Sequence, residues 1–153
     1  MSIATAGWSE VSGIGLHEGT AGPGWDHEPD IGPSPLILPV LLRQMLTGWS
    51  EGRLWVGEWD GWGDRKRPAG SRPLTVPGRR YHVTATSPRE LLTGLDRDRL
   101  PDVVWDEAGT FIILADIDLP STVIGCREGI AEGLLRIPGL EAVRVDGGAP
   151  VVA

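Results

Sequence analysis

The chain has 153 residues, 41% hydrophobic and 23% charged, which fits one domain able to bury a core and excludes wholesale disorder. Its net charge of −7 is unevenly divided: residues 1–62 hold 8 acidic and 2 basic side chains, residues 63–99 hold 4 and 9, and residues 100–153 hold 9 and 3. The acidic flanks argue against general binding of duplex nucleic acid, although the basic middle leaves room for a local anion site.

Two features bear on the compartment. No apolar run approaches the roughly 20 residues that a membrane span needs. A secretory signal begins with basic residues, and here no Lys or Arg precedes Arg43. Cys126 is the only cysteine, which excludes an internal disulfide, and we interpret it as a small buried side chain rather than a nucleophile. We therefore expect a cytoplasmic protein without a membrane partner.

The N-terminal part, residues 1–35, contains seven glycines and four prolines and so resists regular structure. It also carries Trp8 and Trp25, and a fully flexible tail rarely needs two tryptophans. We predict a partly docked segment over residues 1–35 and a single α+β domain over residues 36–153.

A helix is predicted from Pro39 to Gly48, because apolar residues recur on one face and a proline suits a first turn. Residues 53–59 are dense in aromatic and β-branched side chains, which predicts a strand followed by a turn at Asp60. Residues 65–80 are rich in proline, glycine and basic residues, which predicts a solvated loop, the most mobile interior segment.

Residues 80–86 alternate, which predicts a half-buried strand whose apolar face carries Tyr81, Val83 and Ala85. Residues 87–90 read Ser-Pro-Arg-Glu, a capping box with proline at the first helical position, and predict a short helix ending near Gly94.

Residues 102–118 predict an antiparallel hairpin with a turn at Gly109, and its second strand is apolar on both faces, as expected near the centre of a sheet. Residues 126–137 predict an amphipathic helix, and residues 140–146 a last strand. This order favours a single α+β domain with a mixed, mostly antiparallel sheet of about five strands and about three helices.

Tryptophans gather between residues 49 and 62, where they either fill a core or receive a ligand. Trp55 and Trp59 share one face of the predicted strand, and Gly57 removes a side chain between them. That gap predicts either a slot for a flat or apolar ligand or close packing of the first helix against the sheet. Trp62 lies in a glycine-flanked turn and is the one expected to be exposed.

Acid–base chemistry has three candidate residues: Asp116, Asp118 and His82. The two aspartates share a strand face, and with Glu58 or Asp60 nearby they would make a carboxylate cluster for a hard cation or for proton transfer. A strand that becomes polar as it leaves a core gives the same pattern, so both interpretations stay open.

Other motifs predict no metal and no cofactor. His17, His27 and His82 are far apart and lack a helical pair spacing. Ser121 lacks a GxSxG context, and the glycine-rich residues 11–19 follow no strand, so neither a hydrolase triad nor a dinucleotide loop is supported.

A resemblance rests on the segments WVGEWDGWG, DIDLPSTVIG and IPGLEAVRV. Over residues 25–146 the chain resembles small uncharacterised actinobacterial proteins in which a WxGxG-type and a DIDxxST-type strand recur in this order. The resemblance implies no known activity. The chain departs from it at Pro120, where such sequences often have an acid, and at Cys126, where they often have a serine that would cap the helix.

We expect a small binding or interaction module whose small-molecule or protein partner meets a tryptophan-rich surface made of Trp55, Trp59, Trp62, Arg79 and Arg80. One alternative is a small enzyme of a biosynthetic pathway that uses the three acid–base candidates. Another is an immunity-like or regulatory protein whose acidic flanks bind a basic partner. The sequence leaves the oligomeric state open.

Overall fold

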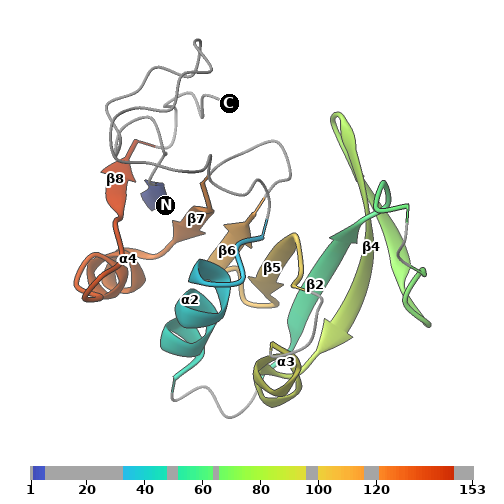
Figure 1. Ribbon diagram of the computed structural model, residues 1–153, viewed down its shortest axis with the longest axis horizontal. Helices are drawn as coiled ribbons and strands as arrows, with labels where there is room; N and C mark the ends of the chain where they lie inside the picture. The colour runs from blue at the N-terminus through green and yellow to red at the C-terminus, as the bar shows by residue number, and fades with distance from the viewer. Residues whose placement is uncertain are drawn as a thin grey trace, which may run out of the picture.

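The fold is one antiparallel sheet with helices against one of its faces (Figure 1). The computed structural model describes residues 2–5, 33–47, 52–63, 66–95, 100–115 and 121–146. The predicted α+β domain is confirmed. The part of the chain outside these ranges includes Asp116 and Asp118, so those two candidates lie outside the described residues.

Eight strands make up the described sheet. They are β1 (Ser2–Thr5), β2 (Leu54–Trp59), β3 (Arg72–Val76), β4 (Arg79–Thr86), β5 (Val103–Asp106), β6 (Phe111–Leu114), β7 (Val123–Cys126) and β8 (Val143–Val145). Their order across the sheet is β3-β4-β2-β5-β6-β7-β1-β8, and every described pairing is antiparallel. The predicted count of five was too low, and the parallel pairing implied by a mixed sheet is not found among these strands.

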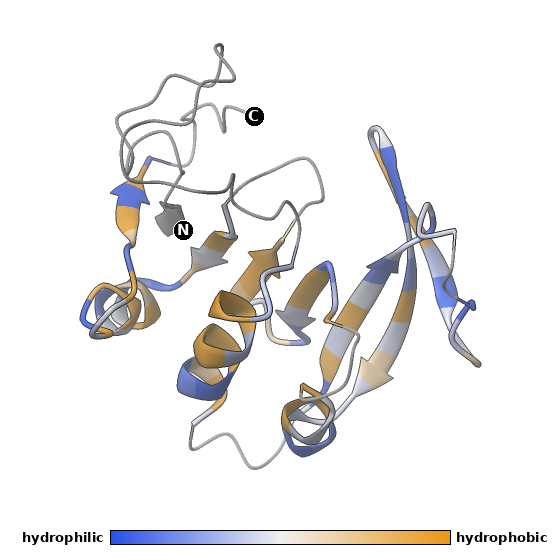
Figure 2. Ribbon diagram, in the orientation of Figure 1, coloured by the Kyte–Doolittle hydropathy of each residue, from blue (hydrophilic) through white to orange (hydrophobic). Residues whose placement is uncertain are grey.

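The three described helices are α2 (Ile37–Leu46), α3 (Pro88–Gly94) and α4 (Glu128–Leu134). Their apolar side chains share a core with alternate residues of the central strands, among them Leu54, Val104, Ile113 and Ile124. Figure 2 shows the matching hydrophobic colouring along α2 and the central strands. Full burial of a leucine in such a core contributes about 2 kcal/mol.

The opposite face of the sheet carries a second apolar cluster, made of side chains from β2 to β6: Trp55, Trp59, Leu74, Tyr81, Val83, Val103, Trp105 and Leu114. All eight come from the strands themselves, and none of the described helices contributes to this cluster. The sheet therefore has one face covered by described helices and one that they leave uncovered.

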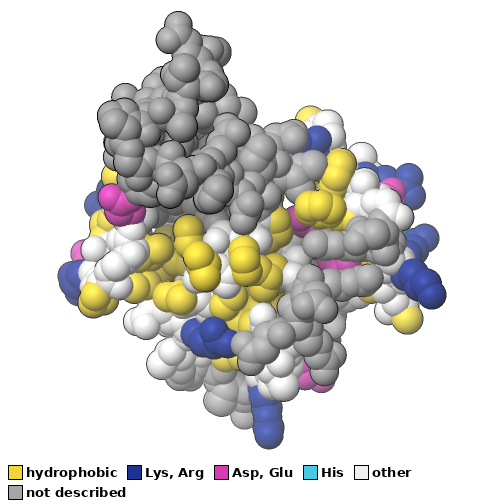
Figure 3. All heavy atoms as spheres, in the orientation of Figure 1, with side chains coloured by type: hydrophobic (Ala, Val, Ile, Leu, Met, Phe, Trp, Pro, Cys, Tyr) yellow, Lys and Arg dark blue, Asp and Glu magenta, His cyan; other side chains and the backbone are white. Residues whose placement is uncertain are grey.

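Helix α2 differs in detail from its prediction. It begins at Ile37 rather than Pro39, and Pro39 lies buried within its first turn. Val40 is exposed, although the apolar pattern placed it on the buried face of the helix. Leu36 and Ile37 nearby are exposed as well. Figure 3 shows hydrophobic side chains over this helix on the surface.

Strand β3 lies where the sequence predicted a mobile loop. Pro77 and Gly78 form a tight turn, with Gly78 at a φ of 76°, and this turn pairs Leu74 with Tyr81. The strand is at the edge of the sheet and mostly exposed, which explains why its composition resembles a loop. Pro73 is tolerated there because an edge strand need not donate every N–H group.

Strand β4 forms as predicted, but its burial does not follow the predicted face. Ala85 is exposed because β3 pairs only as far as Val83 and leaves Ala85 without a neighbour on that side. His82, predicted to face solvent, is 8% exposed. The two faces of β4 are therefore both partly buried.

The capping box and the hairpin turn form as predicted. Ser87 accepts a hydrogen bond from the Glu90 backbone N–H, and the Glu90 carboxylate accepts one from the Ser87 N–H. Gly109 has a φ of 64° in the turn between β5 and β6. These local motifs specify their structure without help from distant residues.

The hairpin turn is held by the buried carboxylate of Asp106. It accepts hydrogen bonds from the Thr110 N–H at 2.7 Å, the Thr110 hydroxyl at 2.6 Å and the Phe111 N–H at 2.9 Å. Burial raises the pKa of Asp106, but these hydrogen bonds outweigh burial, so the pKa lies below the ordinary 3.8.

A lowered folded-state pKa means that Asp106 contributes stability above the ordinary carboxyl pKa, and that this contribution is lost as the pH falls through the lowered value. We expect Asp106→Asn to reduce the free energy of unfolding by about 1–2 kcal/mol at neutral pH. The difference in the free energy of unfolding between the parent and the variant should shrink on acidification. Asp106 of the parent then becomes protonated and loses its contribution, whereas asparagine does not titrate. Urea unfolding at about pH 7 and about pH 3 measures both values; a difference that stays constant or grows towards low pH contradicts the assignment.

Candidate functional site

Trp55 and Trp59 share one face of β2, as predicted, and Trp105 of β5 lies on the same face of the sheet. Strand pairing places Trp105 of β5 opposite Trp55 of β2, with ring centroids 6.4 Å apart and planes at 21°. Trp59 meets Trp62 edge to face at 5.8 Å. All four are half-buried. The sequence reading missed Trp105, because only the β2–β5 register reveals that it faces Trp55.

Two arginines complete this surface. The guanidinium carbon of Arg53 lies 5.8 Å from the Trp55 ring centroid, and that of Arg79 lies 5.5 Å from the Trp59 ring centroid. Cation–π contacts of this kind are worth about 0.5–1 kcal/mol at exposed sites. We call these six residues the aromatic face: Trp55, Trp59, Trp62, Trp105, Arg53 and Arg79.

Arg80, predicted to belong to the same surface, does not join it. As the neighbour of Arg79 on an extended strand, it points to the other side of the sheet. There its Nε lies 3.2 Å from a carboxylate oxygen of Asp60. The structure thus brings together Trp55, Trp59, Trp62 and Arg79 of the predicted binding residues.

The predicted gap at Gly57 is filled by neighbouring strands. A Cβ atom at Gly57 would lie 2.5 Å from Val103 Cγ1 and 3.5 Å from Tyr81 Cβ. Neither a ligand slot nor a helix occupies this position, because α2 packs on the other face of the sheet. Gly57 instead lets Val103 and Tyr81 meet between the two indoles.

Trp62 is half-buried rather than exposed, because a carboxylate holds its indole. Asp102, 1% exposed, accepts a hydrogen bond from the Trp62 Nε1–H at 3.1 Å and one from the Trp59 backbone N–H at 2.7 Å. Asp102 therefore fixes the end of β2 and the turn that carries Trp62. Sequence reasoning missed Asp102, and its only signal was an acid placed directly before an apolar strand.

A cluster of polar side chains lies on the face of the sheet that the helices cover, where β2 ends and β4 begins. Asp60 is hydrogen-bonded to His82 Nε2 and ion-paired with Arg80. The His82 side chain is 10% exposed, and its Nδ1 has no hydrogen-bond partner among the described residues. Glu58, the cross-strand neighbour of His82, likewise has a buried Oε2 without a partner there. His82, a predicted acid–base residue, is thus paired with Asp60.

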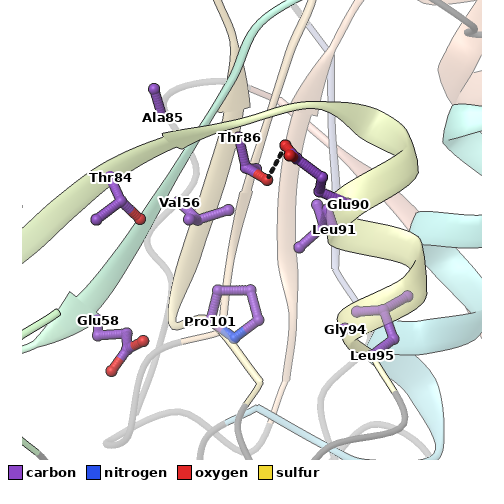
Figure 4. A pocket seen from close by; sticks show the side chains of 10 residues that line it. All are labelled: Val56, Glu58, Thr84, Ala85, Thr86, Glu90, Leu91, Gly94, Leu95 and Pro101. Carbon is purple, nitrogen blue, oxygen red and sulfur yellow. Dashed lines mark hydrogen bonds between the residues drawn. The ribbon is translucent and has the colours of Figure 1, made fainter. Parts of the chain in front are cut away.

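A pocket of about 370 Å³ lies between α3 and strands β2 and β4 (Figure 4). Figure 4 shows Glu58 and Glu90 at its two ends, with Val56, Leu91 and Pro101 between them. The hydrogen bond from the Ser87 N–H, together with one from the Ser87 hydroxyl, holds the pKa of Glu90 below its usual value. The pocket therefore has a carboxylate at each end, and its walls combine apolar side chains with two threonines, Thr84 and Thr86.

Cys126 is fully buried in the helix-side core, as predicted. Burial, followed by the charge of Glu128, raises the pKa of its thiol. Its surroundings are those of a structural side chain.

Comparison with known proteins gives no relative: no protein family, no curated protein and no solved structure matches the chain. The resemblance to actinobacterial proteins stays a prediction. Within the described ranges, no helix is long and apolar enough to cross a membrane. Nor do any three His, Cys, Asp or Glu side chains there group in a way that could hold a metal ion.

Proposed function

We propose that the chain is a cytoplasmic binding module whose aromatic face holds a protein segment with acidic and apolar side chains. The observation that carries this proposal is the set of four indoles and two arginines on a sheet face that no described helix covers. Tryptophan and arginine are the residues most enriched at binding hot spots, because they bring large contact area and directional polar groups.

The filled position at Gly57 favours a protein over a small flat ligand. Val103 and Tyr81 occupy the space between Trp55 and Trp59, so the aromatic face is a broad surface without a cleft between these two indoles. The indoles extend across β2 and β5, and strand pairing adds Arg72 of β3 to the same side as Val83 and Arg79. A surface of this width suits a helix or an extended segment of a partner.

The charge of the face favours an acidic partner. Arg53, Arg72 and Arg79 project on this side, and Glu107 pairs with Arg53 at 3.4 Å. The excess of arginines suits partner carboxylates better than the basic partner of the immunity-like alternative. A chain whose one cysteine is buried needs no oxidising compartment to fold, which agrees with a cytoplasmic setting.

Selection of random peptides displayed on phage against the immobilised chain tests the proposal. We expect enriched peptides to combine acidic with aromatic or aliphatic residues. Their affinity should fall by roughly tenfold or more in the Arg53→Glu, Arg79→Glu double variant. Arg89→Glu is the control for a charge reversal away from the aromatic face, because it makes one such reversal on α3, across the sheet.

The double variant must first show the parent circular dichroism spectrum. Three results would overturn the proposal: no enrichment above an empty support, enriched peptides without acidic residues, or equal affinity for the parent and the double variant.

A further inference from the structure

We propose that the pocket between α3 and strands β2 and β4 binds a small organic cation with an ammonium group, for which Glu58 is the counter-ion. Glu58 and Trp59 are consecutive on β2, so this pocket and the aromatic face lie on opposite sides of the sheet. The proposal therefore stands independently of the protein-binding function.

The lining of the pocket sets the chemistry of its ligand. Carboxylates of Glu58 and Glu90 stand at its ends, and hydroxyls of Thr84 and Thr86 lie along one wall. None of the described lining residues is basic. The walls are otherwise mostly apolar, from Val56, Leu91, Leu95 and Pro101. A positive group joined to a short apolar body is complementary to this arrangement.

Two buried polar atoms, one on the pocket-lining Glu58 and one on its strand neighbour His82, lack a hydrogen-bond partner among the described residues. Glu58 Oε2 is shielded from solvent and has no hydrogen-bond partner among the described residues, and the same is true of His82 Nδ1. Strand pairing places these two side chains directly opposite each other. Asp60 is hydrogen-bonded to the other ring nitrogen of His82, Nε2.

A buried carboxylate oxygen without a hydrogen-bond partner is destabilising, because it has lost water and gained no donor. A single ammonium group carries three N–H donors and a positive charge, so it can satisfy Glu58 Oε2 and a second acceptor together. The carboxylate of Glu58 therefore favours a donor-rich cation over a neutral or anionic ligand.

A divalent metal ion fits less well than an ammonium ion. Calcium and magnesium require six or more oxygen ligands close together. Glu90 Oε2 already accepts hydrogen bonds from the Ser87 N–H, the Ser87 hydroxyl and the Thr86 hydroxyl, and it lies at the far end from Glu58. Among the described lining residues, Glu58 is the glutamate with a carboxylate oxygen, Oε2, that has no hydrogen-bond partner.

Titration of the full chain with benzylammonium, followed by amide chemical shifts in two-dimensional NMR, tests this site. We expect saturable shifts centred on Thr84, Thr86 and Gly94, with a dissociation constant in the millimolar range or below. Benzyl alcohol, which has the same ring without the charge, should bind at least about tenfold more weakly.

Two variants assign the effect to the pocket. Glu58→Gln should weaken benzylammonium binding by about tenfold, whereas Glu141→Gln, an exposed glutamate outside the pocket, should leave it unchanged. Thr84→Leu keeps Glu58 but adds bulk to the pocket wall, and it should weaken binding as well. The proposal fails if no saturable shift occurs, if benzyl alcohol binds equally well, or if folded Glu58→Gln retains the parent affinity.

Discussion

Replacing Asp102 by alanine is expected to lower the free energy of unfolding by about 3 kcal/mol, the largest effect of any single substitution considered for this chain. The substitution leaves the Trp59 backbone N–H and the Trp62 indole N–H without their carboxylate acceptor in a part-buried setting. An unsatisfied donor is far more costly than the net value of one hydrogen bond, because it cannot return to water.

Asp102→Asn and Glu107→Ala serve as comparisons for this result. Asparagine keeps one acceptor oxygen, so Asp102→Asn should lower the free energy of unfolding by less than Asp102→Ala does. Glu107 lies nearby on the same hairpin, and its exposed ion pair with Arg53 at 3.4 Å should contribute less than about 1 kcal/mol. Urea unfolding gives all three values. Equal stability of Asp102→Ala and Glu107→Ala would show that Asp102 does not anchor the tryptophans.

Replacing Gly61 by alanine is expected to cost about 2 kcal/mol and to move the indole of Trp59. A Cβ atom at Gly61 would lie 2.2 Å from Trp59 Cζ2 and 2.3 Å from Cη2, closer than any allowed contact. The ring must shift, which disturbs its edge-to-face contact with Trp62 and its position beside Arg79.

Gly63→Ala is the matched control, because it makes the same change two residues away. A Cβ atom there would have no neighbour within 4 Å among the residues that the structure describes, so the variant should be neutral or slightly stabilised. Urea unfolding and the tryptophan fluorescence maximum distinguish the two variants. If both behave alike, the close packing of Trp59 against Gly61 is contradicted.

Local motifs account for the parts of the fold that could be predicted from the sequence. The capping box at Ser87 and the hairpin turn at Gly109 need only a few consecutive residues, and both formed as expected. The apolar period of residues 126–137 likewise predicted α4, because burial of one helix face repeats every three to four residues. Such signals survive in any tertiary context.

The missed elements depend on long-range pairing. Strand β3 is an exposed edge whose composition matches a loop, and only its register with β4 makes it a strand. Strand β7 has four residues, including Gly125, too few to show an alternation. Strand β1 lies in residues 1–35, which were predicted to resist regular structure, and it pairs with β7 and β8. The predicted count of about five strands was low because these three strands were missed.

In the candidate sites, too, local patterns could be predicted from the sequence, whereas contacts made by strand pairing could not. The alternation of β2 predicted that Trp55 and Trp59 share a face, but Trp105 and Asp102 join them only through the pairing of β2 with β5. His82 was predicted as an acid–base residue from its type alone. Its partner Asp60 is 22 positions away and comes within reach through the pairing of β2 with β4.

Solvent access to the indoles tests most directly whether the aromatic face is open for binding. Single Trp→Phe variants assign the indole NMR signals, and a soluble gadolinium chelate broadens those that solvent can approach. We expect strong broadening for Trp55 and Trp105, and weaker broadening for Trp62, whose indole N–H is held by Asp102. Sharp signals for Trp55, Trp59 and Trp105 alike would contradict an open binding face, because some other part of the chain would then cover it.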